Sequence, residues 1–204
     1  MNIFFRVQDL GIIRDIFLYK IYPVNLINLK KDNDLIIDIG AHIGCFSLLA
    51  NKLTNKEVIA IEPEEENFKL LTKNILLNKA KIMPVKCAIS NYNKTKKFYK
   101  SFSTLSHSLR KISETFEYVK VMKLKTLLKK MKITLNDIKL IKLDAEGEEL
   151  RIIRDSKNIL SKKPILFIDV IEISRKERES MYKLLKKMNF SVLFFKKAGI
   201  YLAL

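Results

Sequence analysis

Short runs of apolar residues alternate with longer amphipathic stretches along this chain from Leu35 onward. The first two runs, Leu35–Ile39 and Glu57–Ile61, are each followed by a stretch with apolar residues at helical spacing, Gly44–Leu53 and Glu64–Leu77. Continuous apolar runs are typical of strands buried on both faces of a parallel sheet, because helices cover both sides. The pattern therefore predicts an α/β fold with a mostly parallel sheet.

The alternation breaks in the middle of the chain and then resumes. A third strand is expected at Ile82–Ala88, whereas Ser90–Lys125 is polar and basic, with strand-like pieces at Thr95–Tyr99 and Tyr118–Leu124. We interpret residues 90–125 as a substrate-facing insertion. The regular pattern then predicts a helix near Thr126–Met131, strands at Ile138–Leu143 and Ile165–Ile171, a helix near Arg175–Met188, and a terminal hairpin of Phe190–Phe195 and Ile200–Leu204 with Gly199 in its turn.

The first twenty residues are unusually apolar, with interrupting charges such as Arg6, Asp9 and Arg14. No apolar run approaches the roughly 20 residues that a membrane-spanning helix needs, and the start lacks the order of a signal peptide. Two interpretations remain for this stretch: a helix or extension that caps the domain, or a segment that lies on a membrane. We expect one globular domain at 34–204, preceded by an N-terminal extension or cap at 1–33.

Composition adds a strong positive charge to this picture. The chain has 204 residues, 48% of them apolar, and 39 Lys plus Arg against 22 Asp plus Glu give a net charge of +17. Such a surplus favours nucleic acid or an anionic membrane surface as a partner, although the Lys-rich composition can also reflect genome bias. Cys45 and Cys87 are widely spaced, so neither a disulfide framework nor a zinc site is indicated, and a cytoplasmic setting fits.

The loop Asp38–Gly44 follows the first predicted strand and carries the first candidate site. Gly40 and Gly44 are separated by three residues, so the loop matches neither the dinucleotide fingerprint G-x-G-x-x-G nor a Walker-type phosphate loop. Its D-x-G-x-x-x-G pattern suits S-adenosylmethionine, which has no pyrophosphate that requires a third glycine. A tight turn without a ligand is the alternative. The candidate cofactor residues here are Asp38, Gly40, Ala41, His42 and Gly44.

A second candidate group follows the next two strands. Glu62 comes twenty-two residues after Gly40, at the end of a strand, where open α/β sheets bind ligands. A carboxylate there can accept hydrogen bonds from both ribose hydroxyls. The alternative is that Glu62 serves only as an acidic residue that stabilises the start of the next helix. Pro63 adjoins it, and Cys87 and Ala88 end the third strand, where a cofactor base could lie, unless they are small packing residues.

Candidate proton acceptors follow later in the chain. Asp144 and Glu146 come after the strand Ile138–Leu143, where two close carboxylates could raise the pKa of one of them toward the range of a base. Alternatively, Asp144 caps a helix and Glu146 lies in its first turn. His107 lies among polar residues and is available for proton transfer. The alternative is a solvated loop histidine without a role in catalysis. No metal site is predicted.

At these segments the chain resembles the FkbM family of S-adenosylmethionine-dependent methyltransferases, in the Rossmann-like class I group. The matching segments cover roughly residues 35–164 and are Ile37–Gly44 with Ser47, Ile61–Pro63 with Asn67, Leu71, Asn74, Leu77 and Asn78, Ala88–Ser90, and Ile141–Glu149. The resemblance implies a mostly parallel seven-stranded sheet with helices on both faces and a C-terminal antiparallel hairpin. It also implies S-adenosylmethionine as the cofactor and O-methylation of a hydroxyl, often on a sugar or another glycan-type acceptor.

The chain departs from this family at three places. His42 stands where Asn is usual, Leu124-Lys125 replaces a usual Leu-Asp pair, and Asp155 replaces a usual Gly. These departures leave the cofactor residues in place and concern the substrate site. Two other functions remain open: a ribose 2′-O-methyltransferase acting on RNA, which the charge favours, and a non-catalytic cofactor-binding or partner-binding domain on the same scaffold.

Overall fold

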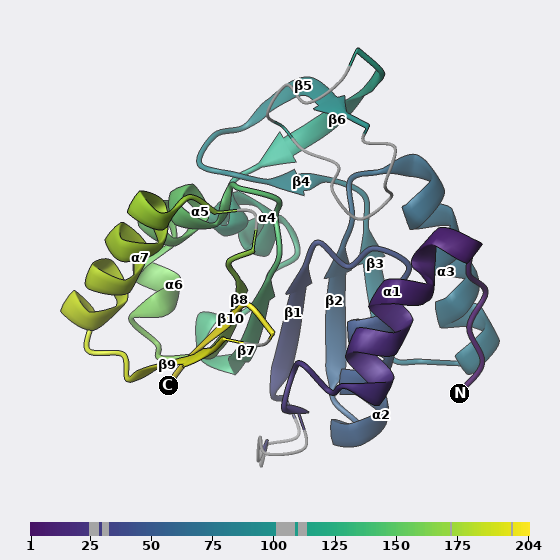
Figure 1. Ribbon diagram of the computed structural model, residues 1–204, viewed down its shortest axis with the longest axis horizontal. Coiled ribbons are helices and arrows are strands. Elements are labelled where there is room, and N and C mark those ends of the chain that lie inside the picture. The colour runs from purple at the N-terminus through teal and green to yellow at the C-terminus, as the bar shows by residue number, and fades with distance from the viewer. Residues whose placement is uncertain (25–28, 30–32, 101–108, 110–113, 172, 197) are drawn as a thin grey trace.

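The computed structural model describes residues 1–24, 29, 33–100, 109, 114–171, 173–196 and 198–204 (Figure 1). Its centre is a seven-stranded sheet in the order β3-β2-β1-β7-β8-β10-β9. The strands are β1 (Leu35–Ile39), β2 (Glu57–Ile61), β3 (Ile82–Val85), β7 (Ile138–Leu143), β8 (Ile165–Asp169), β9 (Val192–Phe195) and β10 (Ile200–Ala203). The first five are parallel, and β10 and β9 form the antiparallel end. The predicted α/β class and terminal hairpin are therefore confirmed.

Helices cover both faces of this sheet, as predicted. Alternate residues of β1 face opposite ways: Ile37 and Ile39 belong to a core shared with the helices α4 to α7, whereas Ile36 belongs to a core shared with α2 and α3. The helices are α2 (Cys45–Thr54), α3 (Glu65–Asn78), α4 (Leu124–Lys130), α5 (Glu149–Asp155), α6 (Lys157–Leu160) and α7 (Arg175–Lys187), with a short 3-10 turn, η4 (Leu135–Asp137), before β7. In Figure 1 these two groups lie on opposite sides of the central strands.

A second, three-stranded sheet lies above one end of the main sheet in Figure 1. It consists of β4 (Ala88–Ile89), β5 (Lys94–Tyr99) and β6 (Phe116–Met122), with β6 in the middle. The predicted third strand, Ile82–Ala88, is wrong in its second half, because β3 ends at Val85 and Ala88 pairs with Val121 of β6 instead. The predicted strand Tyr118–Leu124 also ends early, since Leu124 begins α4.

The N-terminal segment packs on the face that carries α2 and α3. It contains a 3-10 turn η1 (Val7–Asp9), the helix α1 (Leu10–Ile13) and a π-helical turn η2 (Arg14–Leu18). Tyr22 anchors its end in the core, with its ring 5.1 Å from Phe46 and 5.6 Å from Phe167 between centroids. Among the described residues, no helix has both the length and the apolar character needed to cross a membrane.

Candidate functional site

A cavity of about 630 Å³ opens where the parallel strands end. The sheet order reverses between β1 and β7, and open α/β sheets bind ligands at the carboxyl ends of the strands beside such a reversal. Residues from the ends of β1, β2, β7 and β8 line the cavity together with residues of the N-terminal segment and the second sheet. The predicted site residues that line it are Gly40, Ala41, His42, Glu62, Pro63, Cys87, Ala88, Asp144 and Glu146.

The loop after β1 needs glycine at its first position. Gly40 has φ +77°, and a Cβ there would lie 1.7 Å from the carbonyl oxygen of Asp144, so no side chain fits. The backbone N–H groups of Gly40 and Ala41 both donate to the carbonyl of Ile61, each at 3.0 Å, which ties the loop to the end of β2. His42 follows with φ +53°, a left-handed conformation that Asn and His adopt more readily than most residues.

Gly44 and Asp38 support the loop from behind, and neither is among the residues that line the cavity. Gly44 has φ +90° and is the N-cap residue before α2, and a Cβ there would lie 2.7 Å from Leu71 of α3. Asp38 is fully buried in β1 and accepts a hydrogen bond from the Ser47 hydroxyl at 2.6 Å. Both residues therefore act on a ligand only through the loop that they hold.

Lys142 is a buried cation that contributes to the lining of the cavity. Its ammonium group donates to the carbonyl oxygen of Gly40 at 2.7 Å and lies 3.1 Å from Asp144 Oδ2 and 3.3 Å from Asp38 Oδ1. Asp38 and Lys142 are register partners on β1 and β7, which places both side chains on one side of the sheet. Burial disfavours the ammonium, but Asp144 and Asp38 hold the pKa of Lys142 well above its usual value. Lys142 thus joins the glycine loop to Asp144.

Glu62 lies at the end of β2 with a buried side chain that both neighbouring loops hold. Its Oε2 accepts the backbone N–H of His42 at 2.8 Å, and its Oε1 accepts that of Glu64 at 3.0 Å. Oε2 has a second lone pair for a further donor such as a ribose hydroxyl, and the second position on Oε1 carries only a long contact of 3.5 Å from Asn67 Nδ2. Burial raises the pKa of Glu62 to about 7, although these backbone hydrogen bonds oppose the shift.

Residues of the N-terminal segment reach the same carboxylate through Asn67 of α3. The Arg6 guanidinium donates to Asn67 Oδ1 at 2.5 Å, and Asn67 Nδ2 donates to Glu62 Oε1 at 3.5 Å. Because Arg6 occupies the amide oxygen, the amide nitrogen of Asn67 faces Glu62. Arg6 also pairs with the buried Asp9, whose Oδ1 lies 3.5 Å from His42 Nε2. The predicted N-terminal extension therefore contributes to the organisation of the site.

Neither ring nitrogen of His42 has a hydrogen bond among the described residues. Burial lowers the pKa of His42 to about 4, against the opposing charge of Asp9, so the ring is neutral near pH 7. A neutral imidazole keeps one donor and one acceptor nitrogen. His42 therefore lines the cavity as a neutral ring whose two nitrogens are buried from solvent, with Nε2 3.5 Å from Asp9 Oδ1.

Asp144 lies at the end of β7, but it does not cap the following helix. That helix, α5, begins at Glu149, and the Asp144 N–H donates to Ile39 of β1 at 3.1 Å. The helix-cap interpretations of Asp144 and Glu146 are therefore wrong. Glu149 organises the intervening turn instead, since its carboxylate accepts the N–H of Ala145 at 2.7 Å and that of Gly147 at 2.9 Å. Burial raises the pKa of Glu149 to about 7.

The end of β8 adds an aspartate that the sequence analysis did not select. Asp169 lines the cavity, and its Oδ1 accepts the N–H of Ile171 at 2.8 Å. Burial and, next, the negative charge of Asp144 raise the pKa of Asp169 to about 7. One signal in the sequence could have identified this residue. Asp169 ends an apolar strand, and Glu62 and Asp144 likewise come directly after apolar strands.

The remaining predicted residues differ in their positions. Cys87 and Ala88 line the cavity, and burial raises the pKa of the Cys87 thiol to about 12, so it stays protonated. His107 lies outside the described residues and remains a prediction from the sequence. Within the described part of the chain, no group of three or more His, Cys, Asp or Glu side chains is arranged to hold a metal ion.

The residues present fit S-adenosylmethionine. Glu62 offers a carboxylate to the ribose, and Gly40, Ala41 and His42 of the glycine loop line the cavity beside it. The cavity volume also falls in the range of about 300–1,000 Å³ that is usual for small-molecule sites. Gly40, Ala41, His42 and Glu62 would therefore hold the cofactor.

Solved structures with a similar fold include a methyltransferase and complexes with SAH or AdoMet. A precorrin-6y C5,15-methyltransferase from Geobacter metallireducens GS-15 superposes with a TM-score of 0.54 at 14% identity, over 89% of this chain and 85% of that one. The N-terminal domain of human METTL16 in complex with SAH gives 0.51 at 16% identity, over 100% and 70%. M. jannaschii TYW2 in complex with AdoMet gives 0.50 at 12% identity, over 99% and 75%. These similarities confirm the Rossmann-like methyltransferase fold.

Family membership follows from the sequence itself. No curated protein matches the chain as a relative. A family model described as the methyltransferase FkbM domain, however, matches residues 38–192, which include the glycine loop, Glu62, Asp144 and Asp169. The chain therefore belongs to the FkbM methyltransferase family and is an S-adenosylmethionine-dependent methyltransferase.

Proposed function

We propose that this enzyme transfers a methyl group to a hydroxyl oxygen of a sugar or another glycan-type acceptor, and that Asp169 accepts the hydroxyl proton. The observation that carries the proposal is the position of Asp169, a half-buried carboxyl group on the cavity wall with a pKa raised to about 7. A base is most effective when its pKa lies near the working pH, because it is then both ionised and able to hold a proton.

Bound S-adenosylmethionine supplies a methyl group that its sulfonium already activates. The chain's own residues have to orient the acceptor, exclude water and remove a proton. Ile12, Ile21, Phe98, Leu109 and Ile171 give the cavity apolar walls that exclude water. Alignment of two reactants in such a site can lower a barrier by roughly 7 to 11 kcal/mol.

Asp169 is suited to the proton transfer by the hydrogen bond that holds it. The N–H of Ile171 donates to Oδ1 and holds the carboxylate in place, and in the proposed reaction the proton of the acceptor hydroxyl goes to Oδ2. Asp144 contributes through its negative charge, which raises the pKa of Asp169, while Lys142 holds Asp144 in place at 3.1 Å. Positioned bases of this kind typically contribute about 10²- to 10⁴-fold in rate.

RNA is the second candidate acceptor, and the net charge of +17 supports it. Lys142 does not strengthen that case, because three acceptor groups already surround its ammonium. Methyl transfer into separate glycan, lipid and RNA fractions of a cell extract distinguishes these acceptors. Label in RNA alone would replace the glycan proposal.

The role of Asp169 is tested with Asp169→Asn. We expect turnover to fall by about 10²-fold or more, because the amide cannot take a proton. The rise of wild-type turnover with pH through about 7 should also be lost in this variant. Asp137→Asn, at the opposite end of the sheet before β7, is the matched control and should retain full activity. If Asp169→Asn is fully active and Asp144→Asn is not, the proton acceptor is Asp144.

A further inference from the structure

The N-terminal segment is apolar on the face that the protein does not cover. Val7 is 82% exposed, Leu18 is 73% exposed and Tyr19 is 66% exposed. Phe4, Phe5 and Leu10 are also at least half exposed. Val7, Leu10 and Leu18 are spaced for one side of a helix, and we call these six side chains the outer apolar face. Six large apolar side chains exposed within sixteen residues are far more than the scattered ones normal for a protein surface.

The opposite side of the same segment already serves the core. Ile16 and Tyr22 are buried, and Ile12, Ile13 and Phe17 pack against them and the helices beneath. The core therefore accounts for one side of the segment only. A segment that has apolar residues on both sides marks a second contact surface.

Charge indicates what covers the outer apolar face. Lys20 is exposed on the segment itself, and the exposed Arg14 pairs with Asp15 at 2.9 Å. Lys73 and Lys79 are exposed on neighbouring α3, whose Asn74 and Asn78 bind the backbone of residues 2 and 4. Two copies of a chain that carries +17 repel each other, whereas the surface of an anionic bilayer attracts it. Apolar side chains with basic residues around them are typical of segments that lie in a membrane interface.

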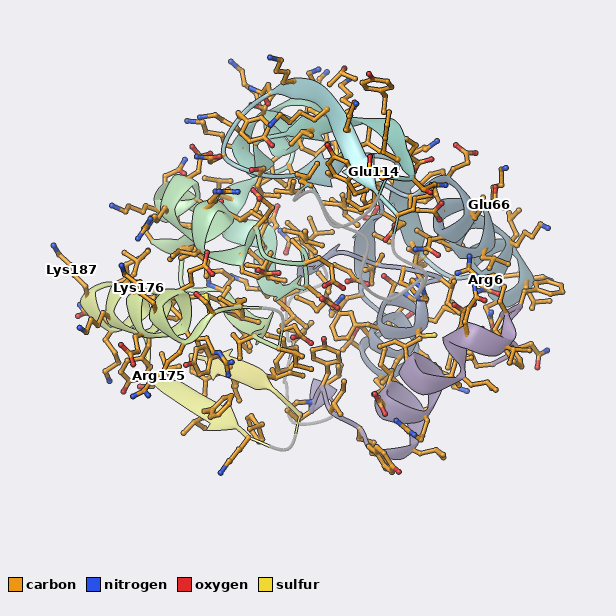
Figure 2. The ribbon with its side chains drawn as sticks, turned by 45° about the horizontal axis from the view of Figure 1, so that its top comes forward. Arg6, Glu66, Glu114, Arg175, Lys176 and Lys187 are labelled. Atoms are coloured by element: carbon orange, nitrogen blue, oxygen red, sulfur yellow. The ribbon has the colours of Figure 1, made fainter. Side chains whose placement is uncertain are left out.

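We propose that the enzyme docks peripherally on anionic lipid bilayers through the outer apolar face. This inference goes beyond methyl transfer and does not depend on it. It places a cavity wall at the lipid surface, because Ile12 and Tyr19 of the same segment line the cavity. A different mode, attraction by charge alone, would use basic surfaces such as α7. Arg175, Lys176 and Lys187 point outward there, on the side of the molecule away from α1 (Figure 2).

The absence of tryptophan from the chain provides a direct reporter. Leu10→Trp introduces the single indole on the outer apolar face, and Leu193→Trp places one on exposed β9 as the matched control. With vesicles of phosphatidylcholine and phosphatidylglycerol, we expect a blue shift of Leu10→Trp emission and none for Leu193→Trp. Pure phosphatidylcholine vesicles should give a smaller shift. No shift of Leu10→Trp, or equal shifts for both variants, overturns the proposal.

Sedimentation with the same vesicles separates apolar docking from charge alone. The double variant Val7→Ser/Leu18→Ser should lower the partition coefficient at least about tenfold. Lys176→Gln/Lys187→Gln, which removes charge from α7, should lower it much less. The reverse result overturns the proposal. A Leu10→Trp blue shift that occurs without vesicles and depends on protein concentration also overturns the proposal. That result means that a second copy of the chain covers the outer apolar face. Circular dichroism confirms that these exposed substitutions leave the fold intact.

Discussion

Removal of the Glu62 carboxylate should weaken cofactor binding strongly. Both oxygens already accept backbone N–H groups, from His42 at 2.8 Å and from Glu64 at 3.0 Å, so the carboxylate is fixed before a ligand arrives. A ribose offers two hydroxyl donors, and a hydrogen bond to a charged group is worth about 1.5–3 kcal/mol. Loss of both bonds in Glu62→Ala corresponds to at least about 3 kcal/mol, or an affinity at least about 100-fold weaker.

The conservative variant Glu62→Gln gives an intermediate result. An amide has one acceptor oxygen, so its NH₂ group must face the N–H of either His42 or Glu64, and one donor loses its partner. We expect S-adenosylhomocysteine to bind about 10- to 150-fold more weakly, which corresponds to one lost charged hydrogen bond.

Isothermal titration calorimetry with S-adenosylhomocysteine measures both effects. Glu57→Gln, at the exposed start of the same strand β2, is the matched control and should bind like the wild type. The 2′-deoxy analogue of S-adenosylhomocysteine supplies a second comparison. The wild type should bind this analogue more weakly than the parent ligand, whereas Glu62→Ala should bind the two ligands almost equally. Unchanged affinity of Glu62→Ala, or an equal penalty for the analogue in both proteins, refutes the assignment of Glu62 to the ribose.

Three further predictions concern the same loop and its supports. Gly40→Ala should lower the unfolding free energy by at least about 3 kcal/mol and Tm by about 6 to 12 °C in a thermal melt, because its Cβ overlaps the Asp144 carbonyl. Arg6→Ala should weaken S-adenosylhomocysteine binding about 3- to 10-fold in calorimetry, since the Asn67 amide loses its fixed orientation; unchanged binding refutes this coupling. Affinity for that ligand should rise as pH increases through about 7, where Glu62 ionises, and Glu62→Gln should flatten this rise.

The strands buried on both faces could be predicted from the sequence. Leu35–Ile39, Glu57–Ile61 and Ile138–Leu143 have the predicted bounds, because a short, mostly apolar run favours one assignment as a central parallel strand. Ala88 was assigned to the wrong sheet, since its partner Val121 lies far along the chain and the local pattern does not show that pairing. The start of α5 was also missed, because Asp144 has the chemistry of a helix cap without its position.

The residues of the candidate site that lie together in one short segment could be predicted from the sequence. Gly40, Ala41 and His42 of the glycine loop line the cavity together with Glu62, as their spacing suggested. Lys142 was not among the predicted site residues, because its partners Asp38 and Gly40 meet it only through the pairing of β1 with β7. Asp169 was missed for a related reason: its raised pKa arises from burial and from Asp144 on a neighbouring strand. Both residues depend on contacts across the sheet.

Transfer of labelled methyl groups tests the central claim most directly. The protein is incubated with S-adenosylmethionine labelled in its methyl group and with fractionated cell extract, and the linkage of the label in the product is determined by nuclear magnetic resonance. We predict label on an oxygen of a glycan-type acceptor, greatly reduced for both Glu62→Ala and Asp169→Asn. Label on nitrogen or carbon, or in RNA alone, would contradict the proposed acceptor, and absence of transfer into every fraction would contradict the enzymatic role itself.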